Sequence, residues 1–203
     1  MKFGIIRFYV AFGITLALTL VLLSEVSHAT SLQIDETLYG KPSTVRSEYG
    51  QMAFLRGEWA IDMVVIDLEG TRSSIAHQAY LTAFYHHDGK TVQTCFVAPN
   101  FYSTDLRGLN EESGVWQGHF LNSNAQRSSH FTIEFNENTF VTNVPGGYSG
   151  HEPFDLRSVA RNVSNSGFIS DVFRTTDNGV TWRHIYEMTY SRILSNSTKR
   201  KNC

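Results

Sequence analysis

From Trp59 onward, apolar and polar residues alternate along short segments that are separated by turn residues. This two-residue period is typical of a half-buried β-strand. The expected strands are residues 59–66, 75–86, 91–98, 101–109, 115–121, 129–135, 138–144, 154–161, 167–175 and 181–193. Because no segment with a helical period separates them, the pattern favours an all-β fold over one that alternates strands and helices.

The turn residues indicate that neighbouring strands pair antiparallel. Asp88-Gly89 and Asp177-Asn178-Gly179 tolerate the positive φ that tight hairpins require, and Pro145-Gly146-Gly147 predicts a longer loop. About 8–10 short strands joined in this way predict an up-and-down antiparallel β-barrel, since closure removes exposed sheet edges.

The N-terminal region predicts export. Lys2 and Arg7 accompany an apolar run over residues 8–23, and Ala29 ends a small-x-small sequence of the kind that signal peptidases cut. Residues 1–29 are therefore expected to be a signal peptide, and the mature protein to be periplasmic or extracellular. The run is shorter than the roughly 20 residues of a spanning helix, so we expect no stable membrane span after cleavage, with an uncleaved anchor as the alternative.

The rest of the chain divides into three parts. Residues 30–46 are polar without a sustained period and are expected to form a mobile arm. Residues 47–194 are expected to be the barrel domain, opened by a short helix over residues 47–55. Residues 195–203, which end in KRKNC, predict a disordered basic tail.

Composition excludes several classes of function. The formal net charge is −2 at pH 7 and basic residues are scattered, which argues against nucleic acid as a partner. The chain has no G-x-S-x-G elbow, phosphate loop or dinucleotide fingerprint. Two cysteines, Cys95 and Cys203, are too few for a disulfide scaffold. The sequence leaves open whether they pair, whether Asn162 or Asn196 is glycosylated, and the oligomeric state.

Alternation predicts which side chains face the barrel interior. On the last expected strand, one face carries a series of aromatic and polar residues that ends at Arg192. The residues expected to line a ligand cavity, from this strand and two others, are Met63, Trp116, Phe120, His184, Tyr186, Met188 and Tyr190.

A Gly-x-Trp at the start of the first strand and an arginine near the end of the last strand resemble the lipocalin pattern within the calycin group. The matching residues here are Gly57, Trp59 and Arg192. The resemblance implies that the indole plugs one end of the barrel and that the guanidinium packs over it, a cation–π contact of about 0.5–2 kcal/mol.

Longer stretches resemble an uncharacterised family of exported bacterial lipocalin-like proteins. They are FLRGEW, GLNEESGVWQGHF and DVFRTTDNGVTWRHIYEMTYSR, within residues 50–193. The resemblance implies a fold and no particular activity. Residues 175–182 are also similar to the Asp box of sialidase propellers, but the motif occurs once where a propeller needs several blades, so it indicates a hairpin only.

Metal and cofactor sites are not expected. His86 and His87 are adjacent in a strand and point to opposite faces, so they do not suit one ion. A haem-binding barrel, with His184 as the axial ligand, is an alternative. For acid–base chemistry the candidates are His184 and Tyr186, provided that they converge with a carboxylate such as Asp62 or Asp171.

Three functions follow as hypotheses. The first is an exported lipocalin-like protein that binds a small, largely apolar molecule in its cavity. The second is a cofactor-independent cyclase, isomerase or decarboxylase acting on an apolar molecule, which the calycin resemblance allows. The third is an envelope protein with a filled barrel that contacts a partner through the N-terminal arm or residues 145–152.

Overall fold

In a computed structural model of the protein, the described residues are 34–75, 78–124, 126–136, 139–149 and 152–194. They form a short α-helix, a 3₁₀ helix and a series of strands. In chain order the elements are α2 (Glu36–Tyr39), η1 (Ser47–Leu55), β1 (Gly57–Ile66), β2 (Arg72–Ser74), β3 (Ala79–Tyr85), β4 (Thr91–Ala98), β5 (Phe101–Leu109), β6 (Trp116–Asn122), β7 (Arg127–Asn136), β8 (Thr139–Ser149), β9 (Glu152–Arg161), β10 (Gly167–Thr175) and β11 (Arg183–Ile193). The expected signal peptide, residues 1–29, and the expected tail, residues 195–203, lie outside the described residues.

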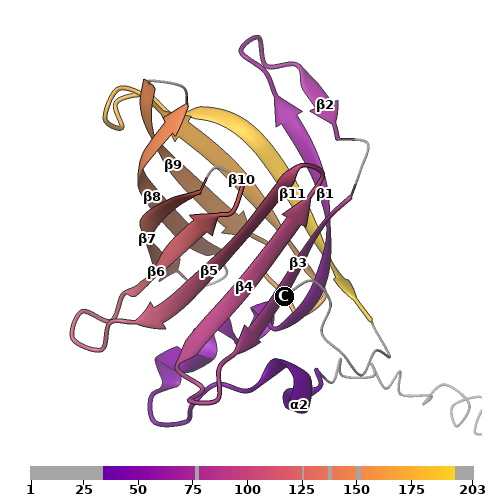
Figure 1. Cartoon of the computed structure of the whole chain (residues 1–203), viewed down its shortest axis with the longest axis vertical. Helices are drawn as coiled ribbons and strands as arrows, with labels where there is room; N and C mark the ends of the chain where they lie inside the picture. Colours follow the sequence, from indigo (N-terminus) through magenta and orange to yellow (C-terminus); the bar gives the residue numbers. More distant parts are fainter. Residues whose placement is uncertain (1–33, 76–77, 125, 137–138, 150–151, 195–203) are drawn as a thin grey trace, which may run out of the picture. The chain divides into compact units, whose positions relative to one another are not determined.

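The strands form a closed antiparallel barrel. Each pairs with its neighbour in the order β1, β3, β4 and onward to β11, and β11 then pairs with β1 from Ile193 opposite Glu58 to Tyr186 opposite Val65. β2 pairs only with the distal part of β1 and lies outside the barrel, at the top of Figure 1. The predicted all-β up-and-down barrel is thus confirmed.

Two local features differ from the sequence-based expectation. β2 was not predicted, because its three residues are all exposed and carry no apolar alternation. Pro145-Gly146-Gly147 was expected to be a loop, but β8 continues through it with a register shift between Val144 and Gly147. Gly146 adopts φ 75°, and its N–H donates to the Asp155 carboxylate at 2.9 Å, so the glycine forms a bulge within the strand.

One end of the barrel is closed by the helical segment. η1 covers this end and buries Tyr49, Met52 and Leu55 against the core. Figure 1 shows α2 and the segment before β1 at this end and β2 at the other. Apolar burial of this kind stabilises by about 25 cal/mol per Å².

The described part of the segment expected as a mobile arm contains packed structure. α2 begins after Asp35, which caps the helix by accepting from the N–H of Thr37 at 2.9 Å. Tyr39 is only 7% exposed, and its hydroxyl donates to Glu58 at 3.2 Å. Gly40 has φ 63°, and a Cβ there would lie 2.5 Å from the Tyr85 carbonyl oxygen. The polar pattern of this segment gave no reason to expect such contacts.

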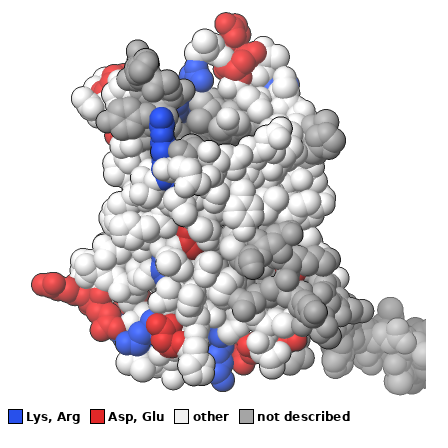
Figure 2. Space-filling model, viewed as in Figure 1, with Lys and Arg blue, Asp and Glu red and all other residues white. Residues whose placement is uncertain are grey.

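Charged side chains lie mostly near the two ends of the barrel on the face shown in Figure 2, and the middle of the wall is largely uncharged. Part of the outer wall is apolar, with exposed Tyr80, Tyr102, Leu106 and Leu121 on β3, β5 and β6. Among the described helices, none has the length and hydropathy needed to cross a membrane.

Candidate functional site

Trp59 and Arg192 form the plug of the closed end. Trp59 is 0% exposed, and its Nε1–H donates to the Leu55 carbonyl at 2.7 Å. The Arg192 guanidinium carbon lies 4.0 Å from the centre of the indole ring. Arg192 also donates to the carbonyls of Phe54 and Arg56, which ties the last strand to the chain that enters the first.

Gly57 is needed for this contact. It has φ 105°, and a Cβ at this position would lie 2.7 Å from Arg192 Nη1. Burial, with a smaller contribution from the charge of Arg56, lowers the pKa of Arg192 to about 10. The guanidinium therefore stays protonated at neutral pH, as a cation–π contact requires.

Above the plug, the barrel encloses a cavity of about 490 Å³ that opens at the other end. This volume is within the range of about 300–1,000 Å³ typical of small-molecule pockets. Most of the lining is apolar. The lining residues are Met63, Val65, Ile75, Leu81, Thr94, Phe96, Ala98, Pro99, Phe101, Ser103, Asp105, Arg107, Phe120, Leu156, Val172, Ile185, Tyr186, Met188 and Tyr190.

Five of the predicted cavity residues line this space. They are Met63, Phe120, Tyr186, Met188 and Tyr190. Trp116 does not line it, because β6 starts at the closed end and places this side chain in the core beneath the cavity. Its Nε1–H donates to Gln51 of η1 at 3.0 Å, and its ring packs edge-on against Tyr49.

His184 is not among the residues that line the cavity, although alternation predicted that it would be. The pairing of β10 with β11 shifts between Val172 and Phe173, so Val172 is opposite Tyr186 while Phe173 is opposite His184. This β-bulge adds Ile185 to the cavity wall and turns His184 to the side of the sheet that carries Phe173. There its Nε2 lies 3.4 Å from Asp171.

The candidate acid–base set is consequently not assembled in one pocket. Asp171 accepts from Arg161 at 2.6 Å beside His184, and Asp62 accepts from Gln78 at 3.2 Å. Tyr186 alone of these candidates faces the cavity. The part of the chain that the structure describes contains no cluster of three or more His, Cys, Asp or Glu side chains suited to a metal ion, and His184 is not positioned to ligate a haem inside the barrel.

An ion pair in the cavity wall was missed by the sequence analysis. Arg107 donates to both carboxylate oxygens of Asp105, through Nε at 2.7 Å and Nη2 at 2.9 Å. The side chains of Arg107 and Asp105 are only 14% and 11% exposed. Burial by itself would lower the pKa of Arg107, but the charge and hydrogen bonds of Asp105 outweigh it and the pKa is raised. Arg107 is therefore protonated at neutral pH.

Tyr190 also lines the cavity near this ion pair, and we call Asp105, Arg107 and Tyr190 the polar floor of the cavity. Its ring stacks on Phe168 at 4.0 Å, and Phe168 in turn packs edge-on against Trp59 of the plug. Burial raises the pKa of Tyr190, so the hydroxyl is neutral and can both donate and accept.

The sequence signal for the polar floor was an Asp and an Arg two residues apart on the same face of β5 as Phe101. It was ambiguous because the opposite face of β5 carries Tyr102 and Leu106.

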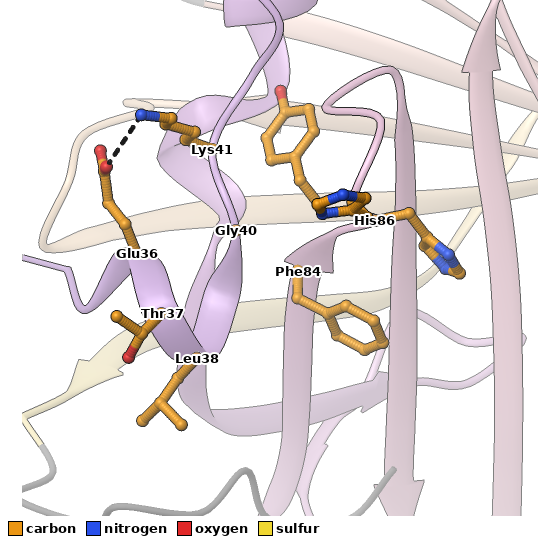
Figure 3. A pocket seen from close by; sticks show the side chains of 9 residues that line it. Glu36, Thr37, Leu38, Gly40, Lys41, Phe84 and His86 are labelled. Carbon is orange, nitrogen blue, oxygen red and sulfur yellow. Dashed lines mark ion pairs between the residues drawn. The ribbon is translucent and has the colours of Figure 1, made fainter.

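A second recess, of about 690 Å³, lies outside the barrel between α2 and the end of β3. Figure 3 shows Glu36 and Lys41 on one wall and Phe84 and His86 on the other. Its charges are paired within the wall, since Lys41 Nζ lies 3.8 Å from Glu36, and His86 stacks on Phe84 and bonds to Gln93 at 3.0 Å. It is larger than the barrel cavity, but its Lys41 and Glu36 side chains are mostly exposed to water, so the cavity is the better candidate site.

Comparisons with known proteins identify the fold and no family. No family model matches the chain, and no curated protein matches it. The crystal structure of Rv2717c from M. tuberculosis aligns at 9% identity over 73% of this chain and 98% of that chain, with a TM-score of 0.52. A redesigned beta barrel aligns at 15% identity over 70% of this chain and 93% of its own, with a TM-score of 0.32. EF1p2_mFAP2b bound to DFHBI aligns at 13% identity over 72% and 100%, with a TM-score of 0.34.

Proposed function

We propose that the protein is a lipocalin-like barrel that binds a small, largely apolar molecule in its central cavity. The observation that carries this proposal is the cavity of about 490 Å³, because barrels of this size are otherwise filled by their own side chains. The plug of Trp59 and Arg192 supports the comparison with lipocalins. Export to the periplasm or the outside belongs to the proposal and rests on the N-terminal sequence alone.

The wall and the floor make different contacts with such a molecule. Met63, Phe96, Phe120 and Met188 offer apolar and polarisable surface to its body. At the floor, Asp105 and Arg107 have a net charge of zero and the hydroxyl of Tyr190 is neutral. A neutral hydrogen-bonding group of the ligand suits this end better than a second anion beside Asp105.

Binding of the neutral fluorophore N-phenyl-1-naphthylamine tests the proposal. The wild-type protein should bind it with a rise in fluorescence, and Met63→Trp should lose most of this binding because the larger side chain occupies the cavity. The matched control is Leu121→Trp, on the outer side of β6 where Leu121 is 42% exposed. Both variants are first checked for the native circular dichroism spectrum. Equal binding to the wild type and Met63→Trp would contradict a site inside the barrel.

A further inference from the structure

Two arginines lie side by side where the barrel opens. Arg174 of β10 is directly opposite Arg183 of β11 and, on its other side, opposite Leu156 of β9. Directly opposed residues share a face of the sheet, and Leu156 lines the cavity. Arg174 and Arg183 therefore lie on the inner side of the sheet at the rim, two residues beyond Val172 and Ile185 of the cavity wall.

No carboxylate of the described residues pairs with either arginine. The Arg174 guanidinium lies 4.4 Å from the centre of the Phe154 ring, and its Nε is buried without a hydrogen-bond partner among the described residues. Like charges placed directly opposite each other on a sheet repel. A guanidinium nitrogen that is withdrawn from water normally donates to an acceptor. Arg174 lacks such an acceptor among the described residues, while Arg183 beside it is exposed.

The nearby acidic groups are engaged elsewhere. Asp177, in the hairpin that joins β10 to β11, accepts from the Thr175 hydroxyl at 2.7 Å and the Thr181 N–H at 2.9 Å. Asp155 accepts from the N–H of Gly146 at 2.9 Å. The rim thus keeps two cationic side chains that no carboxylate of the described residues neutralises.

These arginines share a recess of about 440 Å³ with Thr176, Thr181 and Trp182, which we call the rim recess. The Thr176 hydroxyl adds a neutral donor to it, whereas the Thr181 hydroxyl already donates to Asp177. Trp182 is held in place by Arg157, whose guanidinium lies 4.2 Å from the centre of the indole ring. The recess combines two cations, the Thr176 hydroxyl and an indole ring at the end of the barrel where the cavity opens, with the ring packed against Arg157 on the outer side of the sheet.

We propose that the rim recess binds the carboxylate of an amphiphile whose apolar part lies in the barrel cavity. This inference rests on the proposed function and adds the chemical class of the ligand. Guanidinium groups present planar pairs of donors that match the two oxygens of a carboxylate. Because the floor already contains Asp105 and has no net charge, the charge of the ligand favours an orientation with its anionic end at the rim.

Two amphiphiles of equal chain length, dodecanoate and 1-dodecanol, test the inference by displacing N-phenyl-1-naphthylamine at pH 7.5 and fixed ionic strength. The wild type should bind dodecanoate about tenfold more tightly than dodecanol, as expected for one or two charge-assisted hydrogen bonds. Arg174→Gln and Arg183→Gln should each reduce this preference, and the double variant should abolish it while dodecanol still binds. Arg127→Gln, which removes an exposed arginine at the start of β7, should keep the preference.

The two proposals fail in different ways. Equal affinity of the wild type for dodecanoate and dodecanol would overturn the rim site and leave the cavity-binding function standing. A preference for dodecanoate that persists in the double variant would also overturn it. If N-phenyl-1-naphthylamine does not bind the wild type at all, the proposed function is wrong and the inference falls with it. Retained dodecanol affinity shows that each variant is folded.

Discussion

Asp105 and Arg107 hold opposite charges in a wall that is otherwise mostly apolar, and both are largely withdrawn from water. The stability of such a pair depends on both members being present, because the loss of one leaves an uncompensated buried charge. The same pair gives the cavity its only charged groups among the residues that line it. Its effects on stability and on binding are therefore separable by substitution.

Replacing Asp105 by Asn should lower the free energy of unfolding by about 3–5 kcal/mol, because Arg107 would remain buried without its counter-charge. The double change Asp105→Leu with Arg107→Leu should cost much less than the sum of the two single changes. Urea unfolding of the wild type, Asp105→Leu, Arg107→Leu and the double variant measures this coupling, and Asp105→Asn is measured beside them. Additive single and double losses would show that the pair does not act as a unit.

The plug provides a second test at the level of one residue. Arg192→Lys keeps a positive charge but loses the flat stacking on Trp59 and the donors to the Phe54 and Arg56 carbonyls. We expect a loss of about 1–3 kcal/mol in the free energy of unfolding. Arg127→Lys, at an exposed site, should change it by less than about 0.5 kcal/mol. Equal stability of the two variants would contradict the role assigned to Arg192.

At the scale of single elements, alternation predicted nearly every strand of the barrel, but it missed the places where alternation is interrupted. The sequence of β11 alternates without a break, but the strand contains one extra residue relative to β10. This β-bulge turns His184 away from the cavity. The Asp105–Arg107 pair was missed for a related reason. Both faces of β5 carry large apolar residues, so the pattern did not decide which face is inside.

The hairpin between β10 and β11 is stabilised by the carboxylate of Asp177. Hydrogen bonds from the side chain and the N–H of Thr181, and from the Thr175 hydroxyl, lower the pKa of Asp177 to about 2 from an ordinary value of 3.8. The charged form is favoured in the folded state, so this contribution is complete above pH 3.8 and is lost as the pH falls toward 2.

Asp177→Ala should therefore lower the melting temperature at pH 7, and its difference from the wild type should shrink between pH 4 and pH 2. Thermal unfolding followed by circular dichroism over this range is the measurement. Glu112→Ala removes an exposed carboxylate from another hairpin and should change the melting temperature little. A difference for Asp177→Ala that stays constant down to pH 2 would contradict the assigned capping role.

At the scale of the whole molecule, the sequence sufficed for the barrel because each strand pairs with its neighbour along the chain, apart from β2 and the closing contact of β11 with β1. The Gly57, Trp59 and Arg192 pattern also indicated where the barrel closes. The free volume above the plug was not predictable. It depends on how side chains from most of the strands pack against one another, and alternation says only which of them face inward.

The most direct test of the central claim is a crystal structure of the protein with N-phenyl-1-naphthylamine at saturating concentration. Our account predicts electron density for the probe inside the barrel, in contact with Met63, Phe120 and Met188. Density confined to the outer wall near Tyr80 and Tyr102, with the cavity unoccupied, would contradict it.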